Sequence, residues 1–149
     1  MLQPATFKFL QALKKNNNKA WFDVNRSLYE NAKADFAAAV DQLIAGIARF
    51  DEPISTLKAK DCMFRINRDV RFSKDKSPYK TNFGASFTPG GKKMNLAGYY
   101  FQCDPSRNFA AGGYYMPMAP DLAKIRQEID YNFDAWKKII NNKTFKKYF

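Results

Sequence analysis

The sequence predicts an α+β fold in which helices flank one central, mainly antiparallel sheet. Apolar side chains recur at helical spacing before residue 50 and after residue 120, and they alternate at a spacing of two in between. Short turn-forming sequences separate the alternating runs, which is typical of an antiparallel meander. The chain has 149 residues, of which 46% are hydrophobic. This is enough for one core, so we expect a single domain over 1–149.

The N-terminal part is predicted to be helical. Apolar spacing favours a short helix over 4–15, and the asparagines at 16–18 end it and offer an N-cap for the next helix. That next helix is long and amphipathic, because apolar side chains from Trp21 to Ile47 hold one face.

About four strands are expected in the middle of the chain, and helices follow again. Glycine, proline and aspartate mark the turns between the strands. Pro120 suits the first turn of a C-terminal helix. The runs that predict the strands are 62–72, 83–87, 96–103 and 109–115.

Charge and composition exclude several classes of function. The net charge of +11 favours an anionic partner. Histidine is absent, so this chain holds no Ser-His-Asp or Cys-His pair and no histidine-bound metal. No phosphate-binding loop, dinucleotide motif, Cys-x-x-Cys pair or tight acidic cluster occurs. We therefore expect no cofactor and no metal site.

Targeting signals are not recognisable in the sequence. The N-terminus lacks the charged-then-apolar order of a signal peptide, and no apolar run approaches membrane length. Two cysteines cannot form a disulfide framework, so buried free thiols are expected. We expect a cytoplasmic protein with no membrane contact, while its oligomeric state is left open.

The most informative segment is the basic segment, residues 64–81, with the sequence FRINRDVRFSKDKSPYKT. It holds six lysines and arginines against two aspartates. Read as a strand, it places Arg68 on the apolar face. A buried unpaired guanidinium is very costly, so Arg68 requires a carboxylate partner, a ligand or a bulge that turns it outward. The opposite face would carry two arginines that could clamp a carboxylate or phosphate, and it comprises Arg65, Asn67, Asp69 and Arg71.

Residues 73–78 are predicted to form a loop, and loops on a rigid sheet often carry sites. Asn25 lies on the apolar stripe of the long helix, and a buried amide needs partners. We therefore expect Asn25 to reach the basic segment or to line the same cleft. The candidate ligand-binding residues are Asn25, Arg65, Arg68, Arg71, Lys74, Lys76, Tyr79 and Lys80.

Three functions fit these residues. The first is a basic cleft that binds an anionic small molecule bearing phosphate or carboxylate. If that cleft is catalytic, Tyr79 or a lysine such as Lys80 would be the acid-base group, and Asp69 or Asp75 would support it. The second is nucleic-acid binding through a basic face with exposed aromatics. The third is a structural or interaction protein whose arginines form an internal ion-pair network.

The chain also resembles the family named domain of unknown function 2461, which occurs in bacteria and fungi. The resemblance implies a fold group but no activity. Members of that family are usually longer at the C-terminus, so we expect that this chain lacks a C-terminal part. The matching pieces are 17–22, Asn25-Arg26, Tyr29, the whole of 64–81, Gly112-Gly113, Ile125-Arg126 and Ile129.

Overall fold

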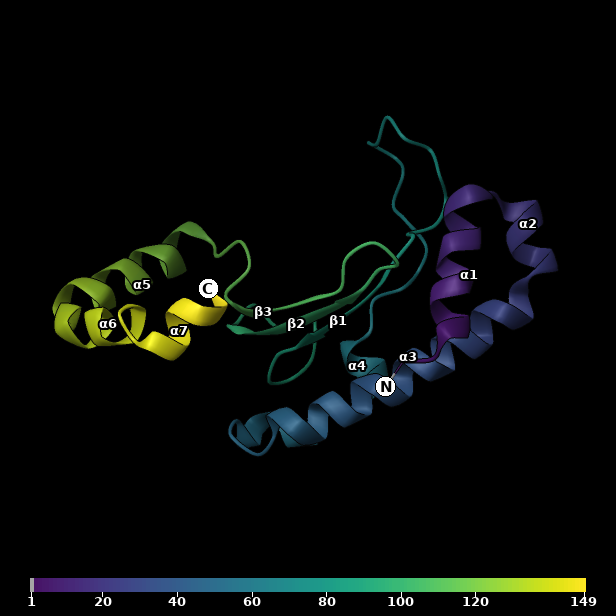
Figure 1. Ribbon diagram of the computed structural model, residues 1–149. Coiled ribbons are helices and arrows are strands. Elements are labelled where there is room, and N and C mark those ends of the chain that lie inside the picture. The colour runs from purple at the N-terminus through teal and green to yellow at the C-terminus, as the bar shows by residue number, and fades with distance from the viewer. Residues whose placement is uncertain (1) are drawn as a thin grey trace. The chain divides into compact units, whose positions relative to one another are not determined.

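The computed structural model describes residues 2–149 and confirms the α+β class (Figure 1). The chain separates into two compact units, Met1–Tyr114 and Tyr115–Phe149. The first unit holds the sheet and the N-terminal helices, and the second is helical. The prediction of one domain over 1–149 stays a prediction.

The N-terminal helices follow the apolar periodicity, with one break. They are α1 (Pro4–Lys15), α2 (Lys19–Val24) and α3 (Arg26–Ile47). The Asn18 side chain caps α2 by accepting a hydrogen bond from the Trp21 amide at 2.9 Å. Asn25 is non-helical (φ −101°, ψ 21°), so the long helix begins only after it.

The sheet contains three antiparallel strands among the described residues, in the order β1-β2-β3. The strands are β1 (Phe83–Phe87), β2 (Gly98–Cys103) and β3 (Phe109–Gly113). In their register, Ala85 pairs with Phe101 and Phe101 with Ala110.

The predicted count of four strands is wrong, because residues 62–72 do not form a strand. Cys62 ends the short helix α4 (Ala59–Cys62), which follows a 3-10 turn at Glu52–Thr56. Met63 makes a single bridge with Ala85, and the chain then leaves the sheet. The predicted face shared by Arg65 and Arg71 is therefore not a strand face.

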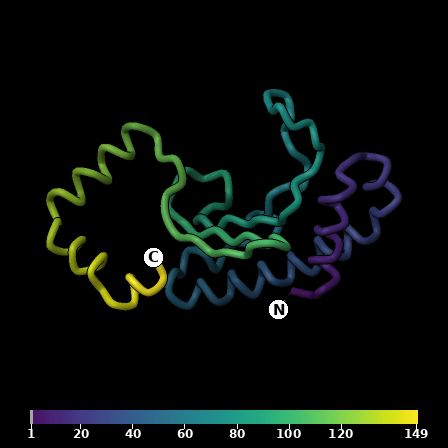
Figure 2. The backbone as a smooth tube through the Cα atoms, turned by 45° about the horizontal axis from the view of Figure 1, so that its top comes forward, coloured from purple at the N-terminus to yellow at the C-terminus, as the bar shows by residue number. Residues whose placement is uncertain are grey.

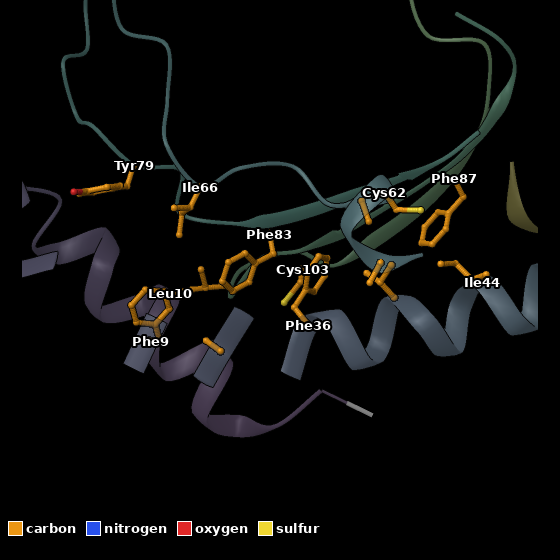
Figure 3. Close-up of a cluster of buried hydrophobic side chains, with 14 of the residues drawn as sticks. Phe9, Leu10, Phe36, Ile44, Cys62, Ile66, Tyr79, Phe83, Phe87 and Cys103 are labelled. Atoms are coloured by element: carbon orange, nitrogen blue, oxygen red, sulfur yellow. The ribbon is translucent and has the colours of Figure 1, made fainter. Parts of the chain in front are cut away.

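The core lies between the sheet and the helices α1 and α3 (Figure 3). Leu10, Phe36, Val40 and Phe87 are almost wholly removed from solvent. The rings of Phe36 and Phe83 stack with centroids 5.2 Å apart, which fastens α3 to β1. Burying each such side chain contributes roughly 1.5–3 kcal/mol. This core makes the first unit a rigid support for the basic segment.

The second unit consists of α5 (Ala119–Tyr131), α6 (Phe133–Ile140) and α7 (Lys143–Tyr148). The predicted C-terminal helices are thus confirmed, and none of them contains a fully buried side chain. Within residues 2–149, no helix is both long and apolar enough to cross a membrane.

Candidate functional site

Residues 67–79 form a hairpin that projects from the first unit, here called the 67–79 hairpin (Figure 2). The amide of Lys80 donates to the Ile66 carbonyl at 2.8 Å, and the amide of Arg68 donates to the Pro78 carbonyl at 2.9 Å. These bonds make the base of the hairpin ladder-like. Because proline has no amide hydrogen, the ladder ends there.

Arg68 has the carboxylate partner that its position requires. Its guanidinium forms an ion pair with Asp75 and also donates to the Ser77 carbonyl at 3.2 Å and the Ser73 hydroxyl at 3.3 Å. Asp75 in turn accepts from the amide and hydroxyl of Ser77 at 2.9 and 2.6 Å. The Ser77 donors, followed by Arg68, hold the pKa of Asp75 well below its ordinary value.

The remaining charges of the hairpin are also largely engaged. Arg71 pairs with Asp69 through two bonds, at 3.0 and 2.7 Å, and this pairing lowers the pKa of Asp69. Lys76 donates to the Val70 carbonyl at 3.0 Å. Lys74 has no ion pair or hydrogen bond within residues 2–149. The structure therefore holds most cations of the hairpin in internal contacts.

Tyr79 is fixed at the base of the hairpin by two distant contacts. The Asn17 side chain donates to the Tyr79 carbonyl at 2.9 Å and accepts from its amide at 3.1 Å. The Tyr79 ring stacks on Phe22 with centroids 4.0 Å apart. Sequence reasoning missed Asn17, because nothing in a run of three asparagines indicates a partner 62 residues away.

A small pocket of about 410 Å³ lies beside Tyr79. Its wall includes Asn67 and Tyr29, and its rim carries the ion pair of Lys19 with Asp23. Cations and acids are nearly balanced here, which makes this pocket a weaker anion site than the groove described next. The remaining lining residues are Phe22, Arg26, Glu30, Lys33 and Ile66.

A larger groove of about 830 Å³ runs between α3, α4 and the first residues of the basic segment, and we call it the basic groove. Its apolar wall is formed by Tyr29, Ala34, Ala37, Met63, Phe64 and Phe83. Its charged lining comprises Glu30, Lys33, Lys60, Arg65, Lys92 and Lys93. Five cations thus face one acid across an apolar surface.

Two of the groove's cations are already engaged within the protein. Lys92 donates to the Lys60 and Asp61 carbonyls at 2.8 and 3.1 Å. Lys33 lies 3.5 Å from Glu30, which is the groove's one acid. The pair of adjacent lysines at 92–93 looks like ordinary surface charge in the sequence, so sequence reasoning missed its place in the groove.

Arg65 lines the basic groove, and the like charge of Lys80 lies near it, beside the ring of Phe64 that forms part of the groove's apolar wall. Neither has a carboxylate within ion-pair distance in the part of the chain that the structure describes. The Lys80 ammonium lies 5.4 Å from the centroid of the Phe64 ring. Burial, and next the charge of Arg65, lower the pKa of Lys80. An anion placed here would offset the repulsion between the two cations and favour the charged form of Lys80.

Asn25 contributes to neither cavity. Its amide donates to the Trp21 carbonyl at 2.9 Å and so satisfies the end of α2. The need for a partner that the sequence predicts is thus met within the same helix turn and not at the basic segment.

Among the candidate acid-base groups, Lys80 has a pKa below its ordinary value, which burial and next the charge of Arg65 cause. Asp69 is held as a carboxylate by Arg71 and is a weak base. Burial raises the pKa of Cys62 and of Cys103 to about 11, so both thiols are poor nucleophiles. Residues 2–149 contain no cluster of three potential metal ligands.

The fold and site define an α+β protein with a three-stranded antiparallel sheet and a basic groove beside its longest helix. The chain belongs to the family described as Conserved hypothetical protein (DUF2461), whose model matches residues 5–149. No curated protein and no solved structure matches the chain.

Proposed function

We propose that the protein binds a small amphipathic anion, a molecule with a carboxylate or phosphate on an apolar body, in the basic groove. The observation that carries this proposal is the pair Arg65 and Lys80, two cations without an acid partner beside an apolar wall. Adjacent like charges next to apolar surface cost free energy unless a counter-charge joins them.

The two parts of the groove match the two parts of such a ligand. A planar guanidinium suits bidentate contact with a carboxylate or phosphate. Charge-assisted hydrogen bonds of this kind contribute about 1.5–3 kcal/mol each. The apolar body would lie against Ala34, Ala37 and Met63, and would contribute roughly 25 cal/mol for each Å² removed from water.

The cysteines bear on where this binding takes place. Cys62 and Cys103 are buried and unpaired. Free thiols persist in reducing compartments, which supports a cytoplasmic location for the protein.

An ion-pair network is a second role, and it applies to the 67–79 hairpin. Arg68 and Arg71 each face an aspartate of the same hairpin. This favours a structural role for these two arginines, while Arg65 and Lys80 are available to a ligand.

The binding proposal is tested with two fluorescent probes of nearly the same shape. 8-Anilinonaphthalene-1-sulfonate is an amphipathic anion, and N-phenyl-1-naphthylamine is its uncharged analogue. Ala34→Trp fills the groove, whereas Ala38→Trp places the same side chain on the same helix outside the groove lining. We expect Ala34→Trp to abolish saturable binding of the anionic probe and Ala38→Trp to preserve it.

The charge requirement is tested separately with Arg65→Gln. This variant should weaken the anionic probe and leave the neutral probe unchanged. Exposed apolar side chains elsewhere, such as Trp136, could also bind either probe, and the groove variants would not alter that binding. If neither Ala34→Trp nor Arg65→Gln changes the affinity for the anionic probe, the proposal is overturned.

A further inference from the structure

The tip of the 67–79 hairpin carries an aromatic ring that nothing covers. Phe72 is 96% exposed, more than any other large apolar side chain among the described residues. The Arg71 guanidinium lies 5.7 Å from the centroid of the ring and leaves its other face open. Leaving a phenyl ring in water forgoes roughly 1.5–3 kcal/mol of burial, which a ligand that covers the ring would recover.

Contacts within the hairpin order the backbone that carries the ring. Arg68 ties both legs together through Asp75, Ser73 and the Ser77 carbonyl. Lys76 crosses to the Val70 carbonyl. A preordered tip lowers the entropy that a ligand must remove on binding.

The charges around the ring select the kind of ligand. Lys74 lies two residues from Phe72 and has no protein partner among residues 2–149. The Arg71 guanidinium lies beside the same ring, although it is also hydrogen-bonded to Asp69. An aromatic face next to cations is how proteins bind single-stranded nucleic acid, with a base on the ring and phosphate on the cations.

We infer that the 67–79 hairpin is a contact point for single-stranded nucleic acid, in which Phe72 stacks on a base and Lys74 contacts a phosphate. Duplex nucleic acid fits less well, because a ring can enter it only by unstacking base pairs. A membrane surface also fits less well, since interfacial binding needs a broad apolar face and this tip offers one ring among charges. This site is separate from the basic groove.

The inference is tested by fluorescence anisotropy with a labelled oligothymidylate of about 16 nucleotides, the upper end of usual site sizes. We expect Phe72→Ala to weaken binding at least about fivefold, because losing a stacked base typically costs that much or more. Phe72→Trp should bind as well as the wild type. The exposed position of Phe72 means that none of these variants should change the melting temperature.

The phosphate contact has its own readout. Lys74→Gln should lower the slope of log affinity against log salt by about 0.7, the value for one phosphate contact on a single strand. Tyr115→Ala is the matched control, because Tyr115 is 85% exposed and lies outside the hairpin. Ala34→Trp should leave oligonucleotide binding intact, which separates this site from the groove.

Two results would overturn the inference. The first is an oligonucleotide affinity that Phe72→Ala leaves unchanged, whether or not Tyr115→Ala lowers it. The second is Phe72-dependent sedimentation with vesicles of phosphatidylserine and phosphatidylcholine without oligonucleotide binding, which would assign the tip to a membrane surface instead.

Discussion

The 67–79 hairpin and the edge of the basic groove differ in how their cations are satisfied, although both belong to the basic segment. In the hairpin, Arg68 faces Asp75 and Arg71 faces Asp69. At the groove, Arg65 and Lys80 have no such partner within residues 2–149. A count of cations would treat the two regions alike. The partner of each cation distinguishes them: the paired arginines stabilise the hairpin, and the unpaired cations belong to the candidate site.

The difference follows from the path of the chain. The hairpin turns within a few residues, so its own aspartates come back to its arginines. Arg65 and Lys80 lie on the two legs at the base, where the neighbouring surface is α3 and the sheet. The acid there, Glu30, is already beside Lys33.

The largest effect on probe affinity should come from reversing a charge at the basic groove, and the same reversal in the hairpin should have a much smaller effect. Arg65→Glu should lower the affinity for 8-anilinonaphthalene-1-sulfonate about tenfold or more, because it removes a charge-assisted hydrogen bond and adds repulsion. Arg71→Glu changes the net charge equally but lies in the hairpin, so it should lower the affinity much less. Fluorescence titration measures both constants. Equal losses would mean that the general field of the protein, and not the groove, attracts the probe.

The next largest effect should be local opening of the hairpin. Arg68→Ala removes the link between its legs and leaves Asp75 without its guanidinium. Hydrogen exchange at the amides of Arg68 and Lys80 should accelerate about fivefold, because the lost hydrogen bonds and ion pair join the two legs that these amides also join. Global melting and probe binding should change little, since the core lies elsewhere.

Arg65→Ala is the matched control for this experiment. It should change hairpin exchange much less, because Arg65 forms no ion pair with the hairpin's aspartates and acts on Asp69 only as a more distant charge. The distinction between the hairpin and the groove would be wrong if Arg68→Ala left exchange unaltered and abolished probe binding, because Arg68 would then belong to the binding site.

Much of the fold could be predicted from local pattern. The helix at 4–15 and the strand at 83–87 have the predicted bounds, since apolar periodicity and turn residues determine both. The run at 62–72 alternates equally well, yet it forms no strand. Alternation cannot show whether a neighbouring strand is within reach. Here the edge of β1 that faces away from β2 is met only by Met63 and Phe64 before the chain turns away.

The site could be predicted only in part. The misplaced charge of Arg68 shows in the sequence that a partner is required, and Asp75 meets that need. The groove could not be foreseen, because Lys60, Arg65 and Lys93 come together only through α4 and the turn after β1. Tertiary contacts of this kind leave no local signal.

A smaller effect is expected in acid. The folded hairpin lowers the pKa of Asp75 below its unfolded value near 3.9, so its contribution is present above that value and is lost as the pH falls through the folded pKa. Hairpin exchange, corrected for intrinsic rates, should therefore stay constant from neutral pH to about pH 4 and accelerate below it. Asp75→Asn should remove the share of this acid step that Asp75 contributes, and the share that remains belongs to Asp69, whose pKa Arg71 also lowers. Acceleration that begins well above pH 4 would contradict the assignment to Asp75.

The smallest effect, and the one most specific to the groove, should appear in base. Lys80 has a lowered pKa in the folded protein, so the unfolded chain binds more protons in the window between the lowered pKa and the ordinary value near 10.5. Stability should rise slightly with pH across that window. Binding of the anionic probe should fall there, because the neutral amine no longer attracts it, and a bound anion should shift the fall to higher pH by favouring the ammonium. Lys80→Met should bind the probe more weakly and without this pH step, while Lys74→Met should retain it. If the pH step in probe binding persisted in Lys80→Met, another group would cause it, and Lys80 would not bind the anion together with Arg65.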